Sequence, residues 1–175
     1  MKIAIHYEAS LVEDGRVAGH DAGATLVRRL MRVFPHAQLI GHATRHAEGF
    51  DVVPLEFVDP TDTVVINMDV IDSMAVWRTL HASGGEPKIM NFVWWNTSQF
   101  DDEVQRASLA LSCALFPTFA NSERTASEVK EIVRSWTVPQ IAEKAQIAWV
   151  NLGIRLEHVK PRQEPEIPVV LYPAI

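Results

Sequence analysis

Short apolar segments alternate with amphipathic helical segments along most of this chain, and that alternation limits its fold more than any other feature. Each apolar segment has about the length of a buried strand, and one of them, Thr63–Met68, is a run of β-branched residues, which favour strands. Strands that are separated by helices of this length are joined by right-handed crossovers, which place them parallel in one sheet. We therefore expect an α/β fold of three layers, in which helices cover both faces of a parallel sheet.

The pattern assigns the elements in order. The expected strands are Lys2–Tyr7, Ala37–Gly41, Thr63–Met68, Lys88–Trp95, Thr118–Ala120 and Ile147–Leu152, with a less regular candidate at Val52–Phe57. We expect the helices over residues 24–34, 71–82, 98–116 and 121–136, followed by a short helical turn. Ser98 is the expected N-cap of the third helix, and Asn121 and Ser122 open the fourth.

Proline suggests where the domain ends. Pro161, Pro165 and Pro168 interrupt a charged stretch, which is typical of a linker. We therefore expect one domain over residues 1–156, a linker over 157–168, and a strand over 169–175. That last strand would be the first of a further domain.

Composition excludes several classes of protein. The one cysteine, Cys113, rules out a disulfide framework and a cysteine-rich zinc site, and its apolar surroundings predict burial. The net charge of −6 disfavours a nucleic-acid partner. No apolar run approaches the ~18 residues of a membrane span, and the N-terminus does not resemble a signal peptide. We expect a cytoplasmic protein, and the histidine spacing predicts no metal site.

A parallel sheet of this kind binds ligands beyond the carboxyl ends of its strands. The first loop at that edge ends in Gly-His-Asp-Ala-Gly just before a helix, where small residues allow close approach and a helix N-terminus favours an anion. Gly19, His20 and Asp21 are therefore ligand-binding candidates, and His20 and Asp21 are also candidates for acid–base catalysis. The alternative is a flexible loop in which Asp21 caps the helix. A dinucleotide site is not expected, because the loop lacks the Gly-x-Gly-x-x-Gly pattern.

Later strand ends supply further candidates. A strand directs two adjacent side chains to opposite faces, so one of Trp94 and Trp95 can reach the ligand cleft. We select Trp95, together with Asn96 and Ser122, as binding residues. In the alternative, both tryptophans pack beneath helices. We expect His6 to be a core or strand-end residue, and Asp69 or Asp72 to cap the following helix.

Three segments carry a family resemblance. They are the opening KIAIHYE, the segment FANSERTASEV, which is similar to an NS-x-x-T strand-to-helix step, and WVNLGIRLEHVKP, which is followed by IPVVLYPAI. In this order they resemble the N-terminal, Rossmann-like domain of a GT-B glycosyltransferase of the retaining, group-one type. The resemblance extends over essentially the whole chain.

The resemblance implies a half-enzyme. Such enzymes transfer a sugar from a nucleotide-sugar donor to an acceptor without a bound metal or other cofactor. The N-terminal domain supplies the acceptor surface, and the donor binds mainly to a C-terminal domain that this chain lacks. The chain would then be catalytically incomplete alone, because the reacting atoms meet between the two domains.

The chain also departs from the family pattern. Its first loop carries Gly19 in place of the usual twin glycine, and Asn96 and Thr97 stand where a histidine is common. One alternative is a stand-alone Rossmann-like binding or regulatory module, which would cover its cleft face by self-association. Another is a flavodoxin- or dehydrogenase-like enzyme. The first helix carries a small basic patch, which we expect to be solvated rather than to contact a membrane: Arg28, Arg29 and Arg32.

Overall fold

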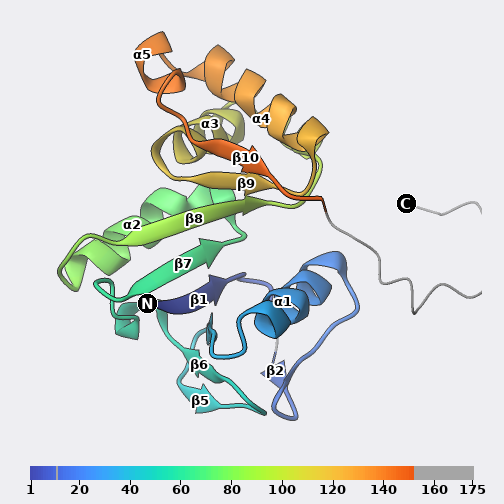
Figure 1. Cartoon of the computed structure of the whole chain (residues 1–175), viewed down its shortest axis with the longest axis vertical. Helices are drawn as coiled ribbons and strands as arrows, with labels where there is room; N and C mark the ends of the chain where they lie inside the picture. The colour runs from blue at the N-terminus through green and yellow to red at the C-terminus, as the bar shows by residue number, and fades with distance from the viewer. Residues whose placement is uncertain (11, 152–175) are drawn as a thin grey trace, which may run out of the picture.

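The computed structural model describes residues 1–10 and 12–151 (Figure 1). Its main sheet has eight strands in the order β10-β9-β8-β7-β1-β4-β6-β5. The strands are β1 (Lys2–His6), β4 (Gln38–Ile40), β5 (Arg45–His46), β6 (Asp51–Val53), β7 (Thr63–Asn67), β8 (Lys88–Val93), β9 (Thr118–Ala120) and β10 (Ile147–Trp149). The expected linker 157–168, the expected strand 169–175 and the last residues of the expected 1–156 domain lie outside the described residues.

All neighbouring strands in the main sheet are parallel except β5 and β6. From β1 the chain adds β4 and β6 on one side, and then returns to add β7, β8, β9 and β10 on the other. The strand order therefore reverses between β1 and β7. In open α/β sheets the crevice at such a reversal is the usual ligand site.

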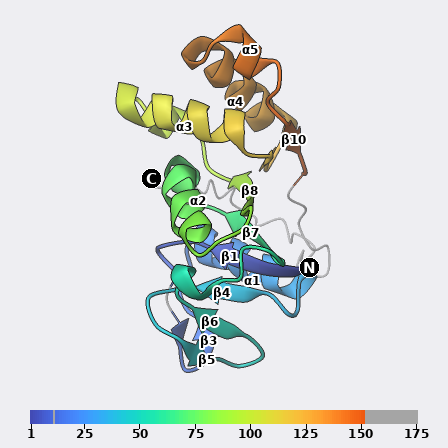
Figure 2. The same ribbon diagram turned by 90° about the vertical axis from the view of Figure 1, so that its left-hand side faces the viewer.

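Helices flank both faces of the sheet, so the predicted α/β architecture is confirmed. One face is covered by α1 (Ala22–Val33), whose Leu26 and Val27 pack with Ile5 and Phe92 of the strands. The other is covered by α2 (Ser73–Ala82), α3 (Glu103–Leu115) and α4 (Glu123–Trp136), which is followed by the short α5 (Pro139–Ala142). Figure 1 shows α1 in front of the sheet with α2 and α3 behind it, and Figure 2 shows the same layers from the side.

Some expected elements differ in their bounds. The strand Thr118–Ala120 is confirmed, whereas the candidate Val52–Phe57 is divided at Pro54 into β6 and the 3-10 turn η1 (Leu55–Phe57). Proline has no N–H to donate to a strand ladder, which accounts for the division. The first loop contains a hairpin that the sequence did not indicate, formed by β2 (Val12–Glu13) and β3 (Arg16–Val17).

The prediction that Ser98 caps the third helix was wrong. Ser98 lies in the 3-10 turn η3 (Thr97–Gln99), and its N–H donates to the side chain of Asn96 at 3.0 Å. Asp102 caps α3 instead, because its carboxylate accepts two backbone N–H groups at 2.9 and 3.0 Å. A carboxylate with two such donors satisfies more of the free N–H groups of a helix start than a single hydroxyl does.

Candidate functional site

The crevice between the carboxyl ends of β1 and β7 is built around Asp69. The carboxylate of Asp69 accepts the backbone N–H of Glu8 at 2.6 Å, and it lies 3.6 Å from Nδ1 of His6. Burial raises the pKa of Asp69, and the Glu8 N–H opposes that rise in part. This side chain therefore joins the two strands. Asp69 and Asp72 occupy the N-cap positions of the 3-10 turn η2 (Val70–Asp72) and of α2, as expected, but neither side chain makes a capping hydrogen bond there.

A buried polar row supports this crevice from below. His6, Asn67, Asn91 and Thr118 are register partners on four adjacent strands, so they lie at one level on one face of the sheet. Ser73, at the start of α2, donates to Asn91 at 2.7 Å and accepts from Asn67 at 2.9 Å. Asn67, Ser73 and Asn91 are fully buried. Such a network is stable only when each polar group has a partner, which fixes the position of each side chain.

Two tryptophans follow β8 and form the wall of a cavity of about 430 Å³ at this edge. Trp94 and Trp95 are both half-buried, and both line it together with Glu8, Asp69 and Asp72. Strand alternation does not send the two indoles to opposite faces, because β8 ends at Val93, before both tryptophans. Trp95 therefore reaches a cavity, as expected, and Trp94 does so as well.

Contacts fix the orientation of the two indoles. Nε1 of Trp94 donates to the carbonyl of Met68 at 3.3 Å, and its ring meets Tyr7 edge-on with centroids 5.7 Å apart. Trp95 packs against Phe100 at a centroid distance of 4.4 Å. Among the described residues that line this cavity, carboxylates supply all the charge. The cavity therefore combines aromatic surface with hydrogen-bond acceptors, and it is not suited to a phosphate group.

Asp21 caps α1, as the alternative for the first loop had it. Its carboxylate accepts the N–H of Ala24 at 2.9 Å, and that hydrogen bond lowers the pKa of Asp21. The Tyr7 ring packs on the same helix start, where burial raises the pKa of its hydroxyl and the charges of Asp21 and Asp69 raise it further. Asp21 therefore lies close to the carboxyl end of β1, and its role as the N-cap of α1 is sufficient to explain why it lies there.

Gly19 and His20 are both exposed, and neither lines the cavity beside Trp94 and Trp95. Gly19 has a positive φ of 91°, which favours glycine. Its carbonyl accepts a hydrogen bond from Arg28 at 2.8 Å, and Arg28 also donates to Val17 at 3.0 Å. Arg28 is thus half-buried and holds the loop, which contradicts its expected place on a solvated face.

Asn96 and Ser122 border a smaller cavity of about 320 Å³, which shares Trp94 and Trp95 with the first one. Ser122 is the N-cap of α4, as expected, and its hydroxyl pairs with Thr125 at 2.9 Å. Asn121 donates to the carbonyl of Trp94 at 2.8 Å and so ties the β9 end to the β8 end. Trp95, Asn96 and Ser122 therefore lie together at one cavity, whereas Gly19, His20 and Asp21, which were expected in the same cleft, do not line it.

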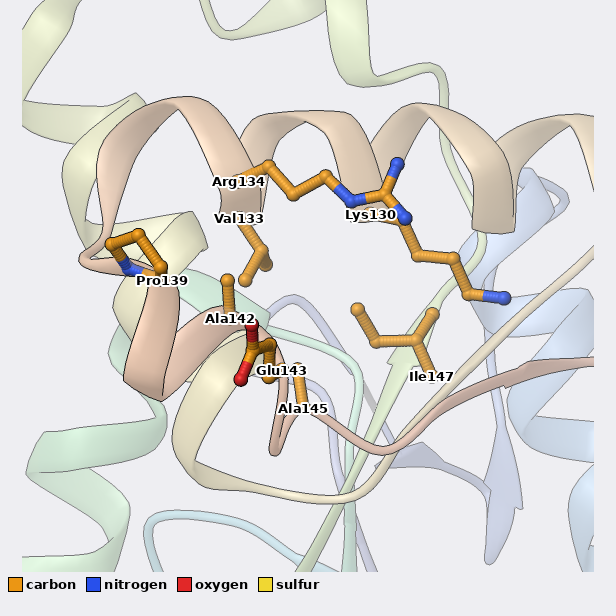
Figure 3. Close-up of a pocket in the computed structure, with 8 residues that line it drawn as sticks. All are labelled: Lys130, Val133, Arg134, Pro139, Ala142, Glu143, Ala145 and Ile147. Carbon is orange, nitrogen blue, oxygen red and sulfur yellow. The ribbon is translucent and has the colours of Figure 1, made fainter.

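Two further cavities lie away from the tryptophans. One, of about 450 Å³, lies between α4, α5 and the start of β10, where Lys130 and Arg134 extend above Ile147 (Figure 3). Because Ile147 begins its strand, this cavity lies at the amino ends of the strands, opposite the crevice. Another, of about 330 Å³, lies beside α1 and includes Arg28 and Arg32. Both are open hollows against helix surfaces.

Sequence reasoning missed His6, Asn67 and Asp69 as site residues. Each is a polar residue at the end of an apolar strand, which is a signal that the sequence does carry. A polar residue at a strand end does not by itself show which strands are neighbours. It is the pairing of β1 with β7 that brings together residues 61 positions apart in the sequence.

No cluster of three or more metal-ligating side chains occurs in the described ranges. None of the helices in the described part of the chain has the length and apolar character that crossing a membrane requires. Comparisons with protein-family models, with curated proteins and with solved structures found no match.

Proposed function

We propose that this chain is the acceptor-side domain of a glycosyltransferase, and that the cavity beside Trp94 and Trp95 binds the acceptor sugar. The observation that carries the proposal is the meeting of two indoles with Glu8, Asp69 and Asp72 in one cavity at the strand-order reversal. The family resemblance of the sequence supports the same function.

The chemistry of a sugar fits this lining. A pyranose ring has a face of C–H groups, which packs on an aromatic ring, and a rim of hydroxyl groups, which donate hydrogen bonds. The carboxylates of Glu8, Asp69 and Asp72 accept such hydrogen bonds. Since the charged groups that line the cavity are carboxylates, they would repel the diphosphate of a donor. The nucleotide sugar would then bind mainly to a second domain.

Ligand-observed NMR tests the proposal on the chain as it exists. We expect saturation transfer to a simple glycoside, such as methyl α-glucoside, and no stronger binding of a nucleotide sugar such as UDP-glucose. Trp95→Ala should weaken glycoside binding roughly fivefold or more, because an aromatic contact contributes about 1 kcal/mol. Trp136→Ala is the matched control, since Trp136 is 39% exposed on α4 and does not line this cavity.

Two results would overturn the proposal. One is the absence of saturation transfer from the protein to any of a set of neutral glycosides. The other is tight binding of the nucleotide sugar by this chain alone, which would place the donor, rather than the acceptor, on this domain.

A further inference from the structure

A separate cavity of about 480 Å³ lies at the carboxyl end of β1, on the side of β4 and β6 and away from the tryptophans. It is lined by His6, Glu8 and residues from the ends of β4 and β6 and from β2 and η1, and its ionisable members are His6, Glu8, Glu13, His42, Arg45 and Glu56. Glu8 also lines the tryptophan cavity, so the two are neighbours. Neither the sequence nor the proposed function assigns a role to this second cavity.

The backbone of Asp69 fixes the orientation of the Asn67 side-chain amide. The N–H of Asp69 donates to Oδ1 of Asn67 at 3.2 Å, and the carbonyl of Asp69 accepts from Nδ2 at 3.1 Å. A flipped amide would place two donors together and two acceptors together. Since a backbone N–H only donates and a carbonyl only accepts, Oδ1 must occupy the position that it has here.

This orientation determines the proton on His6. Oδ1 of Asn67 lies 2.8 Å from Nδ1 of His6, and Oδ1 can only accept, so Nδ1 must carry a proton. The Asp69 carboxylate, 3.6 Å from the same nitrogen, favours that proton as well. Nδ1 is therefore protonated in both the neutral and the cationic ring, and the proton that can be lost lies on Nε2. Within the described residues Nε2 has no hydrogen-bond partner.

We propose that the neutral His6 ring presents the lone pair of Nε2 to this cavity as the acceptor for a ligand hydroxyl group. The remaining lining favours the same ligand chemistry, because Glu8, Glu13 and Glu56 supply further acceptors. The one arginine, Arg45, donates to the carbonyl of Val12 at 3.1 Å. The cavity thus favours a polyhydroxyl compound over an anion. The ligand role rests on the proposed sugar-binding function, whereas the protonation of Nδ1 does not.

The test is a long-range ¹H–¹⁵N correlation spectrum of the seven histidine rings at about pH 8.5, where an ordinary imidazole of pKa about 6.5 is neutral. The His6 ring is assigned by its loss in His6→Gln. We expect Nδ1 to show the shift of a protonated nitrogen and Nε2 that of a bare one, the reverse of the form that neutral imidazole favours in water. A ring with its proton on Nε2 would overturn the inference.

Methyl α-glucoside is then added to the labelled protein. We expect the ¹⁵N shift of Nε2 to move as the lone pair accepts a hydroxyl, and His6→Gln to weaken glucoside binding at this cavity roughly five- to tenfold. His36→Gln is the matched control, since His36 is exposed and lines neither this cavity nor the one beside the tryptophans. If the glucoside gives saturation transfer but Nε2 does not move, the hydroxyl role of His6 is wrong and the proposed function stands. If no glycoside binds at all, the proposed function and the hydroxyl role of His6 both fail, whereas the protonation of Nδ1 is decided by the spectrum of the free protein.

Discussion

Gly23, in the first turn of α1, is the position at which a single methyl group should disturb the crevice most directly. A Cβ added to Gly23 would lie 2.5 Å from Cε1 of Tyr7, and closer still to Cζ and the hydroxyl. No rotation within the helix removes that overlap, so Gly23→Ala requires the Tyr7 ring to move. The ring would then lose its edge-on contact with Trp94.

The expected change in stability combines three effects. Insertion of a methyl group into a packed position costs about 1–3 kcal/mol, and the loss of an aromatic pair costs about 0.5–1.5 kcal/mol. Replacement of glycine by alanine inside a helix recovers up to about 1 kcal/mol. We therefore expect Gly23→Ala to lower the free energy of unfolding by roughly 1–3 kcal/mol, measured by urea denaturation.

A double-mutant cycle with Tyr7→Ala isolates the cause. Without the Tyr7 ring, Gly23→Ala meets no obstacle and should be neutral or stabilising, so the coupling between the two positions should be about 2 kcal/mol or more. The reasoning is refuted if Gly23→Ala is equally destabilising in the Tyr7→Ala background. It is refuted as well if Gly23→Ala stabilises the otherwise unchanged chain.

Three further predictions concern single side chains. Burial raises the pKa of Cys113 to about 12, so we expect a thiol reagent at pH 8 to react with it only after denaturant is added, and rapid reaction in the folded protein would contradict this. Ser73→Ala removes the hydroxyl that donates to Oδ1 of the buried Asn91 and one of the two acceptors of the Asn67 amide, and should cost about 1–3 kcal/mol in urea denaturation. Thr79→Ala, which removes only an exposed hydrogen bond to Ala75, should cost less than about 0.5 kcal/mol; equal costs would show that the buried network contributes nothing. Asp21→Ala should cost about 1 kcal/mol at pH 7. Because the pKa of Asp21 is lowered in the folded state, its contribution is present above the unfolded pKa of about 3.9 and lost as the pH falls through the folded value, so a difference independent of pH would exclude the charged cap.

The fold could be predicted because its main signals are local. The β-branched segment that begins at Thr63 and the apolar stripe of the helix that follows Ser122 each show their periodicity within one element. The cap of α3 was missed for a local reason too. Ser98 and Asp102 both precede the same apolar stripe, and the choice between them depends on the 3-10 turn, which the Asn96 side chain stabilises.

The candidate site could be predicted only in part. Trp95, Asn96 and Ser122 lie on consecutive strand ends of adjacent strands, so the order of elements was sufficient to bring them together. His6 and Asp69 depend instead on the pairing of β1 with β7 and on its register. The sequences of short strands that no tight turn connects indicate neither which strands pair nor in what register. A polar residue at the end of such a strand therefore resembles a surface residue or a helix cap.

The same buried side chains that hold the crevice also specify how its strands align. A shift of β7 by one residue against β1 would turn Asn67 toward the α1 face, where Ile66 and Met68 now pack among apolar groups. Asn67 would lose its partners, and Ser73 and His6 would each lose one, at about 1–3 kcal/mol for each buried polar group left without a partner. The correct register is then favoured by several kcal/mol over the shifted one. A substitution that weakens this polar row should therefore disturb both the alignment of β1 with β7 and the geometry around Asp69. A substitution in the purely apolar core should lower stability without this combined effect.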